Sequence, residues 1–195
     1  VHRATTLDGR EVAVKVQYPG VATAVTSDLE NTDLLFNLLG AVFPGLDPAP
    51  IVTELRERLV EELDYRIEAE HQRLFADAYR GHPFIRVPEV LDEWSSARVL
   101  TSEFVEGASF SEVQDWPDSE RQLAAETLYR FAFGGIYRLG AFNGDPHPGN
   151  YLFHHGGRVT FLDFGLCKRF SAAEVEVFED MIRAMVIERD PAKFR

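Results

Sequence analysis

The chain has little of several residue types, and each shortage excludes a class of protein. Its single cysteine, Cys167, excludes an internal disulfide and any metal site built from several cysteines, which fits a reducing compartment. No apolar run approaches the roughly 18 residues that a membrane-spanning helix needs, and no signal-peptide pattern opens the chain. The net charge of −12 argues against nucleic acid as a partner, because phosphate backbones are bound by clustered Lys and Arg. We therefore expect a soluble, cytoplasmic protein.

Lysine is scarce as well, since only three of the 20 basic residues are lysines. Lys15 stands out among them because it lies within the apolar strand pattern Val12-Ala-Val-Lys-Val16. A lysine with such neighbours needs an anion or a carboxylate to compensate its burial. An edge-strand lysine that faces solvent is the alternative, but the uniformly apolar neighbours favour a lysine that contacts nucleotide phosphates.

The remaining composition is that of a globular chain, with 195 residues of which 45% are apolar. Hydrophobic periodicity and turn residues predict an α+β organisation with a boundary between two lobes near Val105. The expected elements are a hairpin over 1–6 and 11–17, helices over about 21–42 and 51–79, strands over 86–94 and 98–104, a helix from a Ser119/Gln122 capping box to 139, a hairpin over 151–153 and 158–162, and a last helix capped by Ser171 and Glu174 that runs to about 189.

The most informative feature is the stretch Gly144-Asp-Pro-His-Pro-Gly-Asn150, followed by Phe161-Leu-Asp-Phe-Gly165. An Asp, an Asn five residues later and an Asp-Phe-Gly after a hairpin are typical of folds that hold a triphosphate and its metal ions. The prolines stiffen the loop, which suits a site that works by positioning. Each motif alone is an ordinary turn, but the two together in this order favour phosphoryl transfer.

Three groups of residues together resemble the UbiB-type, or AarF-like, atypical kinase family over essentially the whole chain. They are the run Val12-Ala-Val-Lys-Val-Gln-Tyr-Pro-Gly-Val21, the element Glu62-Leu-Asp-Tyr65 with Glu68-Ala69, and the Asp145 and Asp163 motifs. The resemblance implies an α+β, two-lobed protein-kinase-like fold. Residues 1–105 would form the N-lobe, an antiparallel sheet with the inserted helix (about 21–42) and a helix of the αC type (about 51–79). Residues 106–195 would form a truncated, mostly helical C-lobe, and the family's Lys-x-Gly-Gln segment and Ala-rich loop would lie upstream of Val1.

Residue by residue, the resemblance implies a complete set of roles. Lys15 would pair with Glu68 and approach the phosphates. Asp145 would take the catalytic-loop role, and Asn150 and Asp163 would bind Mg²⁺. Glu62 and Asp64 would form the family's Glu-x-Asp motif. Backbone groups of Glu103 and Val105 would meet the adenine, and Ser102 would be the gatekeeper residue. His147 would either donate to a phosphate when protonated or brace the loop.

The function that the resemblance implies is that of a Mg²⁺-dependent, ATP-binding atypical kinase or ATPase. It further implies a role in the biosynthesis of ubiquinone or another isoprenoid lipid, with lipid or quinone-pathway proteins as partners and peripheral membrane association of the intact protein. Two alternatives stay open: a small-molecule phosphotransferase of the aminoglycoside or choline kinase type, and a nucleotide-binding scaffold without turnover.

Overall fold

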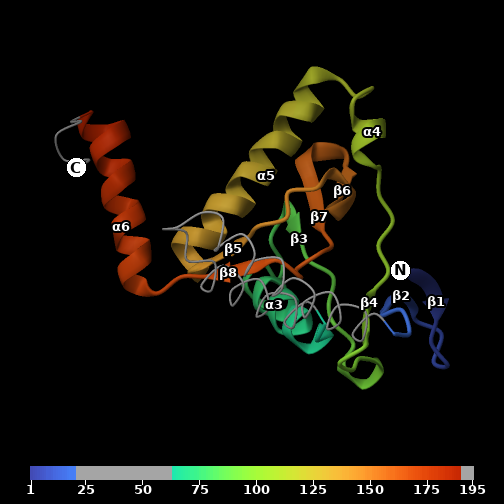
Figure 1. Cartoon of the computed structure of the whole chain (residues 1–195). Helices are drawn as coiled ribbons and strands as arrows, with labels where there is room; N and C mark the ends of the chain where they lie inside the picture. The colour runs from blue at the N-terminus through green and yellow to red at the C-terminus, as the bar shows by residue number, and fades with distance from the viewer. Residues whose placement is uncertain (21–62, 190–195) are drawn as a thin grey trace, which may run out of the picture. The chain divides into compact units, whose positions relative to one another are not determined.

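The computed structural model of the chain describes residues 1–20 and 63–189 (Figure 1). The chain divides into two compact units, and each is described by itself. The first comprises Val1–Glu70 and Val90–Phe104, and the second comprises His71–Glu89 and Val105–Arg195. The helix expected over 21–42, the first part of the helix expected over 51–79, and Glu62 lie outside the described residues.

The first unit contains an antiparallel sheet in the order β1-β2-β4. Strands β1 (His2–Thr5) and β2 (Glu11–Val16) form the predicted hairpin, with Gly9 at φ 88° in its turn. Strand β4 (Val99–Glu103) pairs with the other edge of β2, so that β2 is the central strand. A central strand is the most protected place in such a sheet, and Val12 on β2 is buried.

Helix α3 (Tyr65–Ala78) begins later than the predicted helix over 51–79. The prediction of one continuous helix is wrong at residues 63–64, where the chain makes a turn and then has no regular secondary structure. The carboxylate of Asp64 accepts a hydrogen bond of 3.0 Å from the backbone N–H of Arg66. Asp is among the best N-cap residues because its oxygen satisfies an amide of the first turn, which explains why the helix begins here.

The main sheet of the second unit has the order β3-β7-β6. Strands β6 (Tyr151–His154) and β7 (Arg158–Phe161) form the predicted antiparallel hairpin, and β3 (Ile85–Arg86) pairs in parallel with β7. Of the strand predicted over 86–94, only Arg86 lies in a strand; Val90 forms an isolated β-bridge with Ser102, and Asp92–Trp94 form a 3₁₀ helix. Pro88 interrupts the predicted strand, because proline has no N–H to donate to a strand ladder.

A second, two-stranded sheet was not predicted. It consists of β5 (Ala141–Asn143) and β8 (Cys167–Arg169), which pair antiparallel with Asn143 opposite Cys167. The two strands bracket the segment that contains both motifs of the predicted phosphoryl-transfer centre.

Two long helices complete the second unit (Figure 1). Helix α5 (Asp118–Leu139) ends, as predicted, at Gly140, which takes the left-handed conformation at φ 57°. Helix α6 (Ala172–Ile182) continues into a π-helical segment, Arg183–Glu188. In the described part of the chain, none of the helices combines the length and apolar character needed to cross a lipid bilayer.

The helix starts follow capping chemistry, with one exception. The predicted box between Ser171 and Glu174 is present at the start of α6. The predicted box between Ser119 and Gln122 is wrong, because the N-cap of α5 is Pro117, two residues before Ser119, and no side chain caps this helix start. Pro117 fixes its own φ at −55°, which is compatible with the start of a helix.

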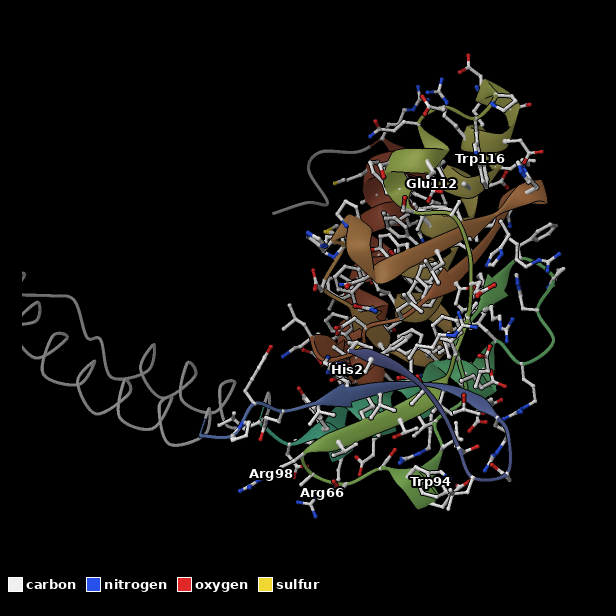
Figure 2. The ribbon with its side chains drawn as sticks, turned by 90° about the vertical axis from the view of Figure 1, so that its right-hand side faces the viewer. His2, Arg66, Trp94, Arg98, Glu112 and Trp116 are labelled. Carbon is white, nitrogen blue, oxygen red and sulfur yellow. The ribbon has the colours of Figure 1, made fainter. Side chains whose placement is uncertain are left out.

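The short helix α4 (Phe110–Val113) begins with a capping box between Ser109 and Glu112 that was not predicted. Figure 2 labels Glu112 of this helix and Trp116, which follows it. The indole of Trp116, which follows α4, stacks on the ring of His155 at the β6–β7 turn, with ring centroids 4.2 Å apart. The turn is therefore held from outside by an aromatic contact.

The core of the second unit is built largely from phenylalanine. Phe131 of α5 stacks on Phe161 of β7 with centroids 3.6 Å apart, and Phe75 of α3 packs against Phe131 at 5.2 Å. Phe164 lies 5.2 Å from Phe75 and is fully buried. The motif Asp163-Phe-Gly165 is consequently anchored in the core through its middle residue.

The close approach of the β6–β7 turn to α5 leads to a testable prediction. Gly157 has φ +75°, and a Cβ there would lie 2.7 Å from the Cβ of Leu123. We expect Gly157→Ala to lower the free energy of unfolding by about 2–3 kcal/mol, since left-handed strain and overpacking both contribute. Urea unfolding measures the change.

Gly156→Ala is the matched control for this prediction. Gly156 has φ +78°, but no atom lies within 4 Å of the place that a Cβ would occupy, so only the backbone strain of about 1 kcal/mol is expected. Equal losses in the two variants would contradict the role assigned to the Gly157 approach.

Candidate functional site

In the first unit, the structure brings Lys15 of β2 together with Glu68 of α3. The ammonium Nζ lies 2.8 Å from Oε1 and 2.9 Å from Oε2 of the carboxylate. Only 6% of the Glu68 side chain and 27% of the Lys15 side chain are exposed. A buried carboxylate requires a cation, and Lys15 supplies it.

The first turn of α3 is held against this sheet by polar contacts from both sides. The side-chain amide of Gln17 donates to the carbonyl of Leu63 at 3.0 Å, and the backbone N–H of Tyr65 donates to the carbonyl of Ala97 at 3.0 Å. The ring of Tyr65 lies 5.3 Å from Nζ of Lys15, within cation–π distance. The orientation of Glu68 toward Lys15 therefore follows from where α3 begins.

Asp64 of the Glu-x-Asp element lies at this helix start. Besides accepting from the Arg66 backbone, its carboxylate pairs with the Arg66 side chain at 2.6 Å, and this hydrogen bond lowers the pKa of Asp64. Asp64 directly precedes helix α3, and its carboxylate caps the first turn of that helix.

The residues expected near the adenine lie at the end of β4 and just after it. Ser102 and Glu103 are paired with Ala13 and Val12 of β2. Val105 follows the strand and is grouped with the second unit.

In the second unit, the structure brings Asp145 and Asn150 together. Nδ2 of Asn150 donates to the Asp145 carboxylate at 2.8 Å, and the carboxylate also accepts from the backbone N–H of His147 at 3.2 Å. Both side chains are half-buried. Since the NH₂ group of Asn150 is directed at Asp145, the acceptor oxygen of the same amide is the end that can bind a cation.

Asn143, which the sequence reasoning missed, links this loop to the Asp163 loop. Its Nδ2 donates to the carbonyl of Asp163 at 2.7 Å, and its Oδ1 accepts from the backbone N–H of Asp145 at 3.3 Å. The backbone N–H of Leu162 also donates to the carbonyl of Asn150 at 3.0 Å. The only signal in the sequence was a polar residue at the end of an apolar segment directly before the motif.

Asp163 itself is oriented by its own turn. One carboxylate oxygen accepts from the backbone N–H of Gly165 at 2.9 Å. The next residue, Phe164, is buried in the core, and its carbonyl lies 3.3 Å from Nδ1 of His71. The backbone that carries the Asp163 carboxylate is thus held on both sides.

Two neighbouring side chains complete the environment of Asp145. Nδ1 of His147 accepts from the backbone N–H of Gly149 at 3.0 Å, so the structure contains the bracing contact that was one of its two predicted roles. Burial, followed by the negative charge of Asp145, raises the pKa of Tyr151 above that of a free phenol. Tyr151 therefore stays protonated close to Asp145, and the sequence reasoning did not single it out.

Asn150 and Asp163 fit the chemistry of a magnesium site. Both offer hard oxygen donors, which Mg²⁺ prefers, and the bonds to Asp145 and Gly165 fix the direction of each group. One or two protein ligands are typical where phosphate oxygens complete the coordination.

The α+β architecture and the paired motifs define the chain as kinase-like. The family model of the ABC1 atypical kinase-like domain matches residues 1–195. The chain therefore belongs to the ABC1 atypical kinase-like family, and the predicted family and fold class are confirmed.

Relatives from several organisms are similar over nearly the whole chain. Rat "Atypical kinase COQ8B, mitochondrial" is 31% identical over 185 residues, which cover 94% of this chain and 35% of that protein. The Arabidopsis thaliana protein "ACTIVITY OF BC1 COMPLEX KINASE 8, chloroplastic" is 33% identical over 204 residues, which cover 99% of this chain and 26% of that protein.

A solved structure is also similar, that of the Rv3197–erythromycin complex from Mycobacterium tuberculosis. It has a TM-score of 0.83 and 35% sequence identity, and the match covers 100% of this chain and 50% of that chain. The present chain thus spans between about a quarter and a half of the length of these relatives.

The Lys15–Glu68 pair generates a prediction about stability. We expect Lys15→Met to lower the free energy of unfolding by about 3 kcal/mol, because it removes the Lys15 ammonium from the buried Glu68 carboxylate. The double variant Lys15→Met/Glu68→Gln should recover most of this loss. Urea unfolding of the single and double variants gives the coupling energy.

An exposed ion pair on the same sheet provides the control. Arg3 and Glu11 are about half exposed, so Arg3→Met should cost less than about 1 kcal/mol. A Lys15→Met variant no less stable than Arg3→Met would rule out the compensating role of Lys15.

The Asn143 link generates a second prediction. Asn143→Ala removes a donor and an acceptor, so we expect a loss of about 1–2 kcal/mol and faster hydrogen exchange at the amides of Asp145 and Gly165. Asn143→Asp keeps only the acceptor. The amide of Asp145 should therefore stay protected from hydrogen exchange, while the amide of Gly165 should lose its protection. Unchanged exchange at both amides in Asn143→Ala would refute the link.

Proposed function

We propose that the intact protein is a Mg²⁺-dependent, ATP-binding atypical kinase or ATPase. The observation that carries the proposal is the linked pair of loops in the second unit. Asp145 and Asn150 are joined by a side-chain hydrogen bond, and Asn143 connects their loop to the backbone of Asp163. Catalysis of phosphoryl transfer depends mainly on positioning and charge, and linked loops of this kind supply the positioning.

The proposed metal and catalytic roles follow from the donor groups. Asn150 and Asp163 would hold Mg²⁺, which when bound with the nucleotide neutralises charge on the phosphate oxygens. Asp145 would accept the proton of the attacking hydroxyl or orient a water molecule. Its hydrogen bonds from Asn150 and His147 hold the carboxylate in one orientation for that task.

The first unit would contribute to nucleotide binding. Lys15, held by Glu68, would approach the phosphates, and its two bonds to the carboxylate support a fixed position of the ammonium. Backbone groups of Glu103 and Val105 would meet the adenine, with Ser102 as gatekeeper, as the family resemblance implies. Glu62 and Asp64 would form the Glu-x-Asp motif of the family.

We further propose that the protein acts in the biosynthesis of ubiquinone or another isoprenoid lipid. Lipid or quinone-pathway proteins would be its partners, and the intact protein would associate peripherally with a membrane. Membership of the ABC1 family over residues 1–195 supports this function over a soluble small-molecule phosphotransferase. Strong stimulation of phosphate release by one small soluble alcohol would instead favour that alternative.

Two carboxylate variants test the proposed roles. We expect Mg·ATP to raise the melting temperature of the wild type. Asp163→Asn should lose the part of this rise that depends on Mg²⁺, as shown by comparison with ATP plus a chelator. Asp145→Asn should keep the whole rise, while phosphate release by the intact protein falls by about 10²–10⁴-fold.

Asp115→Asn is the matched control, because Asp115 is an exposed carboxylate of the second unit outside both motifs. It should leave the thermal shift and phosphate release unchanged. A full Mg²⁺-dependent shift in Asp163→Asn would overturn the metal assignment. Nucleotide binding without phosphate release by the intact wild type would identify a scaffold.

A further inference from the structure

Helix α3 contacts the Asp163-Phe-Gly165 turn through two side chains that are one helical turn apart. Nδ1 of His71 lies 3.3 Å from the carbonyl oxygen of Phe164, and the ring centroid of Phe75 lies 5.2 Å from that of the Phe164 ring. Positions i and i+4 of a helix face the same side, so both side chains approach Phe164 together. The helix thus holds the backbone of Phe164 as well as its side chain.

The direction of the His71 hydrogen bond follows from its partner. A carbonyl oxygen can only accept, so Nδ1 of His71 must carry a proton and donate it. Phe164 has no exposed surface, so bulk water cannot take the place of this donor. A buried carbonyl that loses its partner costs free energy, and the turn therefore depends on the His71 proton.

The carbonyl that His71 holds belongs to the same peptide unit as the N–H that holds the Asp163 carboxylate. This peptide joins Phe164 to Gly165, and its N–H donates to Oδ1 of Asp163 at 2.9 Å. The C=O and N–H of a trans peptide point in opposite directions, because the unit is planar. Fixing the carbonyl therefore also fixes the direction in which the N–H meets the carboxylate.

The glycine at position 165 makes this restraint important. Glycine adopts both signs of φ at little cost, so the 164–165 peptide could rotate if neither of its ends were bonded. After such a rotation the Asp163 carboxylate would face a carbonyl oxygen in place of an N–H, and neither of these two groups can donate. The hydrogen bond from His71 opposes this rotation by holding the other end of the peptide.

We propose that His71 is a positioning residue for the Asp163 carboxylate. It acts through the Phe164–Gly165 peptide: its proton fixes the carbonyl, and the N–H of the same peptide then orients the carboxylate. That the oriented carboxylate binds Mg²⁺ rests on the proposed function. Removal of a group that orients a metal ligand typically lowers metal affinity by about 10–100-fold.

The tautomer of His71 is the first test, and it requires neither metal nor nucleotide. A long-range ¹H–¹⁵N spectrum of the labelled chain distinguishes protonated from unprotonated ring nitrogens. We expect Nδ1 of His71 to be protonated at neutral pH. An unprotonated Nδ1 would overturn the proposal, because the imidazole could then not donate to Phe164.

Two variants of His71 separate the donor from the ring. His71→Leu removes the donor, and we expect the Gly165 amide to exchange about tenfold faster than in the wild type, since one bond that holds its peptide is lost. His71→Asn restores a donor at the same distance from the backbone, because Nδ2 of asparagine and Nδ1 of histidine are each bonded to Cγ. It should return the exchange of Gly165 close to that of the wild type.

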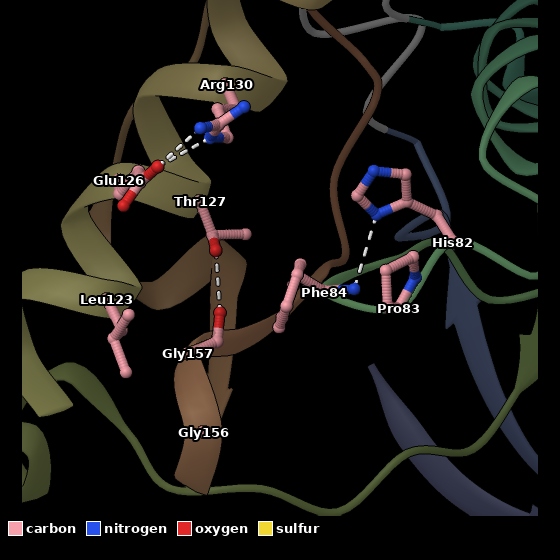
Figure 3. Close-up of a pocket in the computed structure, with 9 residues that line it drawn as sticks. All are labelled: His82, Pro83, Phe84, Leu123, Glu126, Thr127, Arg130, Gly156 and Gly157. Carbon is pink, nitrogen blue, oxygen red and sulfur yellow. Dashed lines mark hydrogen bonds and ion pairs between the residues drawn. The ribbon is translucent and has the colours of Figure 1, made fainter.

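Thr127→Val is the matched control for a general loss of stability. Thr127 of α5 lines the pocket shown in Figure 3, together with other α5 residues, residues 82–84 and the turn Gly156–Gly157. Its hydroxyl, like the His71 imidazole, donates to a backbone carbonyl, that of Gly157 at 2.7 Å. Thr127→Val removes this bond with little change of shape, so it should lower the free energy of unfolding and leave the exchange of Gly165 unchanged.

Magnesium affinity is the readout that a purely structural role would not move. In a thermal-shift titration of Mg²⁺ at saturating ATP, His71→Leu should raise the half-saturating Mg²⁺ concentration by about tenfold. His71→Asn and Thr127→Val should leave it near the wild-type value. A wild type without a Mg²⁺-dependent shift would count against the proposed function, and the tautomer and the Gly165 exchange would still decide the role of His71.

Equal exchange of Gly165 in His71→Leu and in the wild type would overturn the proposal. The same holds for equal acceleration in His71→Leu and Thr127→Val, and for a His71→Asn variant that does not restore protection. An unchanged Mg²⁺ requirement in His71→Leu would overturn the link between His71 and the metal.

Discussion

The antiparallel pairing of β5 with β8 is the constraint on which the candidate site of the second unit depends. It brings the chain before Asp145 next to the chain after Gly165. Asn143, at the end of β5, then uses both ends of one amide to hold the Asp145 and Asp163 loops at a common spacing. The burial of Phe164 anchors the second loop in the core. Side chains that act together at one site must be held to within a fraction of an ångström, and these links restrict the movement of the two loops.

The first unit depends on a comparable constraint, the burial of a charge. The Glu68 carboxylate is nearly inaccessible, so it must keep its cation, and Lys15 is thereby held at a fixed place on the central strand. The start of α3 at Tyr65 makes this pairing possible, because it sets the place of the first turn, which carries Glu68. Capping by Asp64 and the bonds to Leu63 and Tyr65 stabilise that start.

The elements that were predicted correctly are those with local causes. Both hairpins, the end of α5 at Gly140 and the capping box at Ser171 follow from turn residues, alternation and caps within a few positions. The errors arose where distant groups compete with a local pattern. Hydrophobic periodicity suggested one helix over 51–79, but nothing in that pattern reveals that Gln17, which directly follows β2, donates to the Leu63 carbonyl. The pairing of β5 with β8 joins residues that are far apart in the chain. Both strands are short and lack a clear alternation of apolar and polar residues.

The sequence by itself determined the family, the kinase-like α+β class and the residue types available for metal and phosphate, because motifs at fixed spacing carry that information directly. Tertiary structure alone decided which of these groups meet. It placed Glu68 against Lys15, used Asp64 as a cap, made Asn143 a link between two loops and built a pocket from three distant segments. The reason is physical: hydrogen-bond partners and burial are properties of three-dimensional packing, and a sequence pattern contains them only where the partners are neighbours in the chain.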